Sequence, residues 1–336
     1  MHLFKSVLIT GCSGVIGQGL ARILDVTGSA NQVVGCDPSE DHPGTRVYDA
    51  CACSRPPEAP DYVDSIRAIA TRYSADLVIP MSEASIWRFA QDGITELDGV
   101  PLLLPNRNAI EIGHDKLRSA RHLEAVGLTA PWTQLVGDGP PPVVPCVLKM
   151  RVGSEGEYFV RIPDQELADY YASRRPDDIW QELLLPDDQE FTCGLYRTRG
   201  GEVRVIALHR TLRAGVTASA KLVDNAEIRR YLVDLAESLE LRGSINVQLR
   251  VTDRGPVAFE INPRFSSSVV LRHLLGFQDF LWALREARGL EAGPYRLSPP
   301  GSRVYHGLRG YVLSAEAAGR RRSARPLALP SNPVIQ

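Results

Sequence analysis

We predict the fold of this 336-residue chain from two short stretches, Asn246-Val247-Gln248 and Glu260-Ile261-Asn262-Pro263-Arg264. Both lie in apolar, β-prone sequence, and Asp253-Arg254-Gly255 between them is typical of a tight turn. We therefore predict two adjacent antiparallel strands. Because successive side chains of a strand point to opposite faces, Glu260 and Asn262 are expected to share one face of this pair.

The polar side chains of this hairpin suit a hard metal ion. Gln248, Glu260 and Asn262 together offer one carboxylate and two amide oxygens. Such an all-oxygen set can hold magnesium that also binds phosphate oxygens. Pro263 ends the strand, and Arg264 can then bind an anion through its forked guanidinium group. The alternative interpretation is a polar strand end with solvated side chains.

Lysine is the second feature that points to a phosphate ligand. Lys149 lies within the apolar stretch Val147-Leu148-Lys149-Met150, where a buried charge without an anionic partner would be costly. Lys116 begins a predicted helix and is a second candidate. Taken by itself, Lys116 is better interpreted as a charge on a helix surface.

A third group follows in Trp180-Gln181-Glu182-Leu183-Leu184. We interpret this stretch as a connector whose backbone edge can hydrogen-bond an adenine ring. Glu190, a little further on, can accept hydrogen bonds from ribose hydroxyl groups. The alternative is an ordinary strand and turn.

The pattern of predicted strands and helices changes once along the chain. Up to about residue 105, short apolar strands alternate with helices, which predicts a parallel, doubly wound α/β sheet. After the proline-rich loop at 137–142, longer strands with polar hairpins predict an α+β unit. Strands are expected at 7–10, 32–37, 76–80, 101–105, 147–150, 158–161, 191–196, 203–209, 245–251 and 256–261, and helices around 20–24, 62–73 and 227–240.

The turn Gly11-Cys12-Ser13-Gly14-Val15-Ile16-Gly17 connects the first strand to the first helix. Backbone amides in this position can bind pyrophosphate, and Asp37 lies where a ribose-binding acid would lie. Alone, these features would suit a nicotinamide-dependent oxidoreductase or epimerase. The spacing is G-x-x-G-x-x-G, however, and no Tyr-x-x-x-Lys pair of a short-chain dehydrogenase occurs. We favour a packing role for the turn, because the later half supplies a better nucleotide site.

The composition is ordinary for a globular protein, with 44% hydrophobic and 23% charged residues. A net charge of −2 gives no reason to expect a nucleic-acid or membrane partner. No apolar run approaches the roughly 18 residues of a membrane span. The six cysteines are scattered without a zinc-binding pattern, so we expect reduced thiols in a cytoplasmic protein.

Together the three groups resemble the ATP-grasp family, most closely its carbamoyl-phosphate-synthase-like branch, over nearly the whole chain to about residue 280. The resemblance implies an ATP-grasp domain at 106–290 with a small lid subdomain at about 130–185. A Rossmann-like pre-ATP-grasp domain at 1–105 would precede it, and 291–336 would form a C-terminal extension.

The resemblance also assigns site residues. Gln248, Glu260 and Asn262 would hold the metal, and Arg264, Lys149 and Arg213 would act on the transferred phosphate. The ATP contacts would come from Lys116, Lys149, Gln181, Glu182, Leu183, Leu184 and Glu190. Arg210 and Thr217 are weaker matches. The cofactors would be ATP and Mg²⁺, with Mn²⁺ as a substitute.

The implied activity is that of a carboxylate–amine ligase, which forms an amide or peptide bond through an acyl phosphate and releases ADP and phosphate. Its partners would be a small-molecule carboxylate and amine, and a homodimer is compatible with the resemblance. The lid segment 153–158 departs from the family pattern because it carries two acids where glycines are usual. The alternatives are an NAD(P)-dependent oxidoreductase or epimerase, and a non-catalytic ATP-binding module, which the acidic lid favours.

Overall fold

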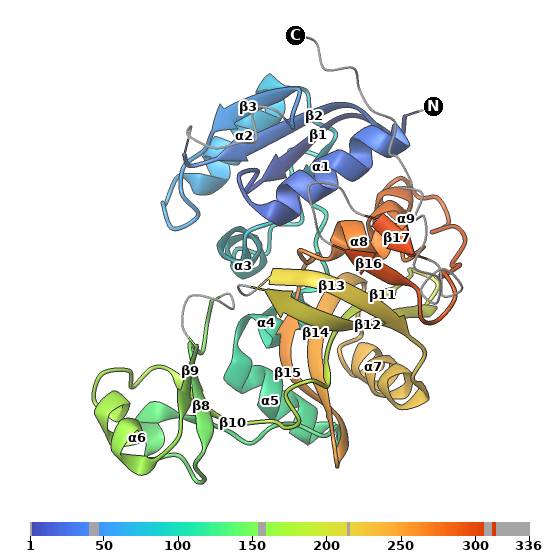
Figure 1. Cartoon of the computed structure of the whole chain (residues 1–336). Coiled ribbons are helices and arrows are strands. Elements are labelled where there is room, and N and C mark those ends of the chain that lie inside the picture. The colour runs from blue at the N-terminus through green and yellow to red at the C-terminus, as the bar shows by residue number, and fades with distance from the viewer. Residues whose placement is uncertain (1, 40–46, 154–158, 214–215, 306–310, 314–336) are drawn as a thin grey trace. The chain divides into compact units, whose positions relative to one another are not determined.

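The computed structural model describes residues 2–39, 47–153, 159–213, 216–305 and 311–313 (Figure 1). The chain packs as two compact units. Unit 1 comprises Met1–Leu104, Thr211–Leu222 and Phe265–Gln336, and unit 2 comprises Pro105–Arg210 and Val223–Arg264. The division at 104/105 falls next to the predicted end of the first domain. The assignments of an ATP-grasp domain, a lid subdomain and a C-terminal extension stay predictions.

The first part of unit 1 is a parallel four-stranded sheet with helices packed on it. The strand order is β3-β2-β1-β4, and the predicted parallel α/β arrangement is confirmed by the pairing of β1 with β2 and β4. The elements are β1 (Phe4–Thr10), α1 (Val15–Thr27), β2 (Ala30–Asp37), β3 (Ala50–Cys53), α2 (Tyr62–Arg72), β4 (Leu77–Ile79) and α3 (Glu83–Gln91). Leu8, Val34 and Val78 pack with side chains of α2 and α3 in one buried cluster, whereas α1 covers the other face (Figure 1).

The prediction of a strand that spans residues 101–105 is wrong. The chain there makes only the short antiparallel pair of β5 (Glu96–Leu97) and β6 (Val100–Pro101), and Leu102 forms a single parallel bridge to Val78. The physical reason is proline, because Pro101 and Pro105 have no backbone N–H to donate to a ladder.

The later segments of unit 1 contribute three antiparallel strands and two helices. β16 pairs antiparallel with both β13 and β17. The elements are β13 (Val216–Val223), α8 (Val269–Leu274), α9 (Asp279–Ala287), β16 (Arg303–Tyr305) and β17 (Tyr311–Leu313). The fully buried Arg272 of α8 is bound to Asp279 at 2.6 Å, which fixes the two helices to each other.

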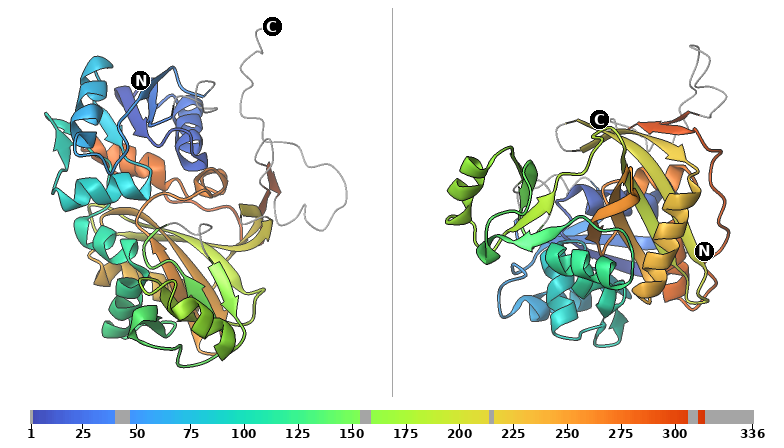
Figure 2. Two further views of the ribbon diagram at one scale, coloured as in Figure 1. Left: turned by 90° about the vertical axis from the view of Figure 1, so that its left-hand side faces the viewer. Right: turned by 90° about the horizontal axis from the view of Figure 1, so that it is seen from below.

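Unit 2 contains a first antiparallel sheet with the order β7-β10-β8-β9. Its elements are β7 (Thr133–Leu135), the short 3-10 helix η2 (Val136–Asp138), β8 (Cys146–Lys149), β9 (Phe159–Ile162), α6 (Gln165–Ala172) and β10 (Ile179–Glu182). The helix α6 packs beside β8 and β9 (Figure 2). Leu148, Trp180 and Ala168 form part of the buried cluster between α6 and this sheet.

The second sheet of unit 2 carries the hairpin that the sequence predicted. Within this unit its order is β15-β14-β11-β12, and the pairs β14–β15, β14–β11 and β11–β12 are antiparallel. The elements are α4 (Arg107–His114), α5 (Lys116–Ala125), β11 (Glu190–Arg197), β12 (Val203–Arg213), α7 (Ala226–Ser238), β14 (Gly243–Thr252) and β15 (Gly255–Asn262).

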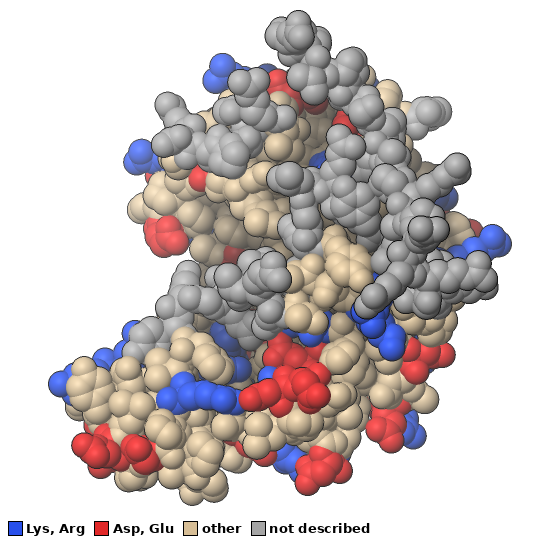
Figure 3. All heavy atoms as spheres, in the orientation of Figure 1, with Lys and Arg blue, Asp and Glu red and all other residues tan. Residues whose placement is uncertain are grey.

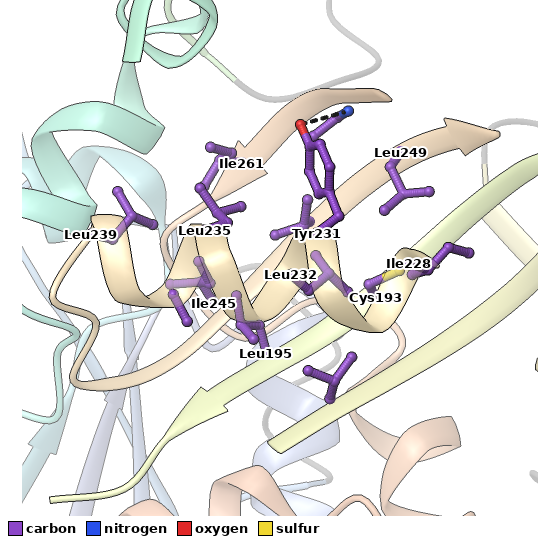
Figure 4. Packing of buried hydrophobic residues seen from close by; sticks show 14 of the residues in the cluster. Cys193, Leu195, Ile228, Tyr231, Leu232, Leu235, Leu239, Ile245, Leu249 and Ile261 are labelled. Atoms are coloured by element: carbon purple, nitrogen blue, oxygen red, sulfur yellow. Dashed lines mark hydrogen bonds between the residues drawn. The ribbon is translucent and has the colours of Figure 1, made fainter. Parts of the chain in front are cut away.

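One face of this sheet is covered by the apolar stripe of α7 (Figure 4). Leu232 and Leu235 of the helix join Val247 and Leu249 of β14 in a continuous buried cluster. The Tyr231 hydroxyl extends this packing by accepting a hydrogen bond from the Ala258 amide, at 3.3 Å. Because side chains alternate along a strand, the residues between these apolar positions in β14 are directed to the other face.

No helix in the described part of the chain is both long and apolar enough to cross a lipid bilayer. The six cysteines form no disulfide.

Candidate active site

The face of the β14–β15 hairpin opposite to α7 carries a buried group of oxygen-bearing side chains. Gln248 lies directly opposite Glu260, and Asn246 lies opposite Asn262. All four side chains are buried, with no more than 7% of any residue exposed. The predicted placement of Gln248, Glu260 and Asn262 on one face is confirmed, and Asn246 is an additional member that the sequence had not indicated.

A β-bulge sets the direction of Glu260. The register shifts immediately after Gln248, so that Leu249 pairs with Ala258 and Phe259 is the extra residue. In a regular strand Ala258 and Glu260 would share one face. The bulge instead leaves Ala258 in the core under α7, while Glu260 faces the opposite way beside Gln248.

Lys149 lies next to the bulge. Its ammonium is 4.7 Å from the ring centroid of Phe259 and 5.7 Å from that of Phe159. Only 6% of Lys149 is exposed, in agreement with its predicted burial. Contacts of an ammonium with ring faces are attractive when the site is desolvated, so the extra residue of the bulge holds the lysine at the polar face.

Lys116 is also buried, and its interpretation as a surface charge is wrong. It starts α5, and its ammonium donates a hydrogen bond of 2.7 Å to the Gly153 carbonyl. Asp115 caps the same helix and accepts a hydrogen bond of 2.7 Å from Arg151. Burial would raise the pKa of Asp115, but the hydrogen bonds from Arg151 and from helix amides outweigh it and lower that pKa. These contacts tie the start of α5 to the segment that leaves β8.

Two arginines hold Glu190. Arg210 donates from Nε to one carboxylate oxygen at 2.8 Å, and Arg250 donates to the other at 2.6 Å. The Arg210 guanidinium also donates to the side-chain oxygen of Gln248. One cation therefore links the predicted ribose acceptor to a predicted metal ligand. Acidic and basic side chains lie next to one another on the described part of the face shown in Figure 3.

The predicted adenine connector leaves the end of β10. Glu182 accepts from Arg254 at 2.6 Å, and the Leu184 carbonyl accepts from Arg250. Gln181 is buried and donates to Thr133. Within the described chain, no hydrogen bond engages the amide N–H groups of Leu183 and Leu184. The connector is thus fixed by its side chains, by the Leu184 carbonyl and by the Glu182 amide, which donates to the Trp132 carbonyl at 3.0 Å, while within the described residues the Leu183 and Leu184 amides have no such partner.

Two further arginines, Arg264 and Arg213, were predicted to act on the transferred phosphate. Arg264 follows the hairpin, is half-buried, and donates its amide to the Asn262 carbonyl at 2.8 Å. Arg213 belongs to β12, but its side chain and that of Thr217 lie outside the described residues. The same holds for residues 154–158 of the acidic lid segment.

A glycine of α4 allows the end of β15 to reach its position. A Cβ atom on Gly113 would lie 2.9 Å from the Ile261 carbonyl oxygen and 2.9 Å from Cδ of Pro263. Real Cβ contacts are not this short, so a larger residue would displace the strand end that carries Asn262. No pattern along the sequence predicts this contact.

The glycine turn of unit 1 is held together by its own residues. Asp37 accepts hydrogen bonds from the Ser13 hydroxyl, at 2.7 Å, and from the Ser13 amide, at 3.3 Å. A Cβ atom on Gly17 would lie 2.8 Å from the Gly11 carbonyl oxygen. These contacts agree with a packing role for the turn, because a side chain at Gly17 would displace the Gly11 carbonyl and Ser13 binds Asp37 of β2.

Comparison with known proteins agrees with the fold. The family model described as "ATP-grasp in the biosynthetic pathway with Ter operon" matches residues 179–305. The structure of N5-carboxyaminoimidazole synthetase from Staphylococcus aureus complexed with ADP aligns with a TM-score of 0.71 and 16% identity, over 92% of this chain and 84% of that chain. The search among curated proteins found no relative.

Two further structures give the same result. L-amino acid ligase from Bacillus licheniformis aligns with a TM-score of 0.68 and 17% identity, over 90% of this chain and 79% of that chain. A biotin carboxylase–ATP complex from Campylobacter jejuni aligns with a TM-score of 0.67 and 15% identity, over 90% and 75%. The chain therefore has the ATP-grasp fold, and its residues 179–305 match an ATP-grasp family model. The carbamoyl-phosphate-synthase-like branch stays a prediction.

Proposed function

We propose that this protein is an ATP- and magnesium-dependent ligase that activates a carboxylate as an acyl phosphate and joins it to an amine. The observation that carries the proposal is the β14–β15 hairpin, which brings Gln248 opposite Glu260 and Asn246 opposite Asn262 on a buried face. The ATP-grasp fold supports it, as do relatives whose names include an ADP complex, an ATP complex and an amino acid ligase.

The donor set of the hairpin fits a magnesium ion that is shared with a nucleotide. Glu260 supplies a carboxylate, and Gln248 and Asn262 supply amide oxygens, all of them hard ligands. The described residues include no group of three His, Cys, Asp or Glu side chains that could hold a metal alone. Mg²⁺ typically uses one or two carboxylates and completes its shell with phosphate oxygens and water. When bound, the ion would neutralise charge on the phosphates, and Mn²⁺ could replace it.

The surrounding residues can bind the rest of ATP. Lys149 and Lys116 are buried cations suited to phosphate oxygens. The Leu183 and Leu184 amides can meet the adenine edge, and Glu190 is held ready to accept from the ribose. The Arg210 guanidinium, which already contacts Gln248, places a further positive charge at the metal end of this face.

The reaction needs positioning and charge neutralisation more than a protein nucleophile. A substrate carboxylate oxygen attacks the γ-phosphorus, and the bond to the bridging oxygen of ADP breaks. The amine nitrogen then attacks the acyl carbon, phosphate leaves with the electron pair of the C–O bond, and the nitrogen loses a proton. Arg264 and Lys149 would offset the charge that develops on the transferred group.

Hydroxylamine provides a test that does not require the natural amine. Purified protein is incubated with ATP, magnesium, pools of carboxylic acids and hydroxylamine, and ADP and hydroxamate are both measured. We expect hydroxamate in an amount equal to ADP for at least one pool, and none with Glu260→Ala. Saturable ATP binding without ADP from any pool would contradict the ligase and favour a non-catalytic nucleotide-binding module.

A further inference from the structure

Two cysteines of unit 1 lie next to each other although they are far apart in the sequence. Cys12 belongs to the glycine turn that follows β1, and Cys51 belongs to β3. In the sheet, β2 lies between β1 and β3 (Figure 1). Neither cysteine takes part in the proposed nucleotide site, so the chemistry of this pair is independent of the proposed ligase function.

Gly35 of β2 brings the two side chains together. A Cβ atom on Gly35 would lie 2.7 Å from Cβ and 3.0 Å from Sγ of Cys12. The Cys12 side chain therefore fills the space that a side chain at position 35 would need. Cys51 is the direct parallel partner of Gly35, and paired residues of neighbouring strands lie about 4.8 Å apart with their side chains on the same face. Cys12 and Cys51 thus meet on the face of the sheet above Gly35.

The two thiols are hydrogen-bonded to each other, and they are not equivalent. Burial raises the pKa of Cys12 to about 12, and the bond to Cys51 and the charge of Asp37 add to this rise. Burial also raises the pKa of Cys51, but the bond from Cys12 acts in the opposite direction. Cys12 is therefore the donor, and Cys51 is the thiol that loses its proton first. Cys12 is completely buried, whereas Cys51 is half-buried, so a reagent reaches Cys51 first.

The other cysteines are placed differently. Cys53 also lies on β3, but it is exposed, and its thiol donates to the Pro38 carbonyl at 3.3 Å. Cys36 is buried in the cluster that the sheet forms with α2 and α3. The remaining two cysteines belong to unit 2. Within the described part of the chain, Cys12 and Cys51 are the two cysteines whose thiols bond to each other.

We propose that Cys12 and Cys51 are a redox-active pair that a hydroperoxide converts to a disulfide. The Cys51 thiolate attacks one oxygen of the peroxide, the O–O bond breaks, and the leaving oxygen takes up a proton. The Cys12 sulfur then attacks the sulfur of the Cys51 sulfenic acid. The S–O bond breaks, and the leaving hydroxide takes the Cys12 proton to form water. For hydrogen peroxide, the sum is two thiols oxidised to one disulfide and one peroxide reduced to two waters.

The new bond joins the glycine turn to β3. Cys12 precedes α1, so the disulfide attaches the chain at the start of this helix to a strand at the edge of the sheet. A small dithiol reverses the reaction by thiol–disulfide exchange. The reduced thiols expected from the sequence are then the resting state of the pair, and the disulfide is its oxidised state.

The test is oxidation of the full-length protein with hydrogen peroxide at mildly alkaline pH. Remaining thiols are blocked with N-ethylmaleimide, and the protein is digested without reduction and mapped by mass spectrometry. We expect a peptide pair that joins Cys12 to Cys51, a protein mass lower by two hydrogen atoms, and recovery of all six thiols after dithiothreitol. A link between Cys51 and Cys53, a sulfinic or sulfonic acid at Cys51 without a link, or no loss of thiols would overturn the proposal.

Serine variants assign the two roles. Cys12→Ser removes the thiol that resolves the sulfenic acid, so oxidation should stop at a sulfenic acid on Cys51 that dimedone labels. If Cys12→Ser fails to fold, Cys51→Ser at the half-buried position should leave Cys12 reduced. Cys53→Ser is the matched control on the same strand and should form the disulfide as the wild type does. A disulfide that still includes Cys12 in Cys51→Ser, or its loss in a folded Cys53→Ser, would contradict the pair.

Discussion

Gln248 of β14 and Glu260 of β15 are direct antiparallel partners, and the register slips by one residue immediately after them. The slip lets Ala258 enter the core while Glu260, two positions later, faces the polar side with Gln248. It also releases Phe259 to lie beside the Lys149 ammonium. A single bulge thus positions a proposed metal ligand and a proposed phosphate-binding cation together.

Glu260→Ala should abolish magnesium-dependent ADP formation while the protein stays folded. The reason is the loss of the one carboxylate in the donor set, which the amide groups of Gln248 and Asn262 cannot replace. Asn262→Ala should have a milder effect. The measurement is ADP release against magnesium concentration, with Glu237→Ala on the exposed side of α7 as the control. Near-normal turnover in Glu260→Ala would remove the metal assignment.

Lys149→Met should weaken ATP binding by about one to two decades. The change removes the charge and keeps most of the apolar stem, and a charge-assisted contact contributes roughly 1.5–3 kcal/mol. Calorimetry with ATP and magnesium gives the affinity directly. Lys221→Met, at an exposed position, is the matched control. If both variants bind ATP as the wild type does, Lys149 has no role at the phosphates.

Gly113→Ala should impair the site from a distance. The added methyl would meet the Ile261 carbonyl and Pro263 at 2.9 Å, and overpacking of this kind costs about 1–3 kcal/mol. We expect lower stability in urea unfolding and a higher magnesium requirement, because the strand end with Asn262 must shift. Gly200→Ala, where the nearest atom would be 3.7 Å away, should change neither. A Gly113→Ala protein with unchanged magnesium dependence would show that the strand end is not positioned by this contact.

Asp115→Asn should reveal a pH-dependent contribution of the α5 cap. The pKa of Asp115 is lowered in the folded protein, so its contribution to stability is present above the ordinary carboxyl pKa of about 3.9. This contribution is lost as pH falls through the lower, folded pKa. Asparagine still caps the helix but loses the charge facing Arg151, so we expect about 1–2 kcal/mol lower stability at pH 7.

The measurement is urea unfolding of wild type and Asp115→Asn between pH 7 and about pH 2, a range that extends below the ordinary carboxyl pKa of about 3.9. The difference should shrink as the solution becomes more acidic. Asp253→Asn, in the exposed turn between β14 and β15, is the control. A difference of the same size at every pH would mean that the charge of Asp115 contributes nothing.

The hairpin and its polar face could be predicted because they depend on local rules. Strand alternation and a tight turn predict the hairpin and place Glu260 and Asn262 on one face, but the register that sets Glu260 opposite Gln248 depends on the bulge at Phe259. The parallel sheet of unit 1 follows from a similar pattern. β3 was missed because Ala50–Cys53 is short and contains no β-branched or aromatic residue, and α3 was missed although Ser82 caps it.

The rest of the site depends on contacts between distant segments. Nothing near Arg250 in the sequence shows that it binds Glu190 and the Leu184 carbonyl. The burial of Lys116 results from the Gly153 carbonyl, which approaches from another element. The bulge at Phe259 could not be predicted either, because no glycine or proline interrupts the strand formers there. Each of these contacts depends on tertiary packing, which a pattern along the sequence does not predict.

One calorimetric series distinguishes a magnesium-dependent ATP site on the β14–β15 hairpin from a nicotinamide site at the glycine turn. Wild-type protein is titrated with ATP plus magnesium and with NAD⁺, NADH, NADP⁺ and NADPH, and the series is repeated with Glu260→Ala and Gly14→Ala. A Cβ atom on Gly14 would make only an ordinary contact of 3.5 Å, so that variant should fold. We predict saturable binding of ATP with magnesium, strongly weakened in Glu260→Ala and retained in Gly14→Ala, and no binding of a nicotinamide nucleotide. Tight nicotinamide binding that is lost in Gly14→Ala, with no ATP binding, would contradict it.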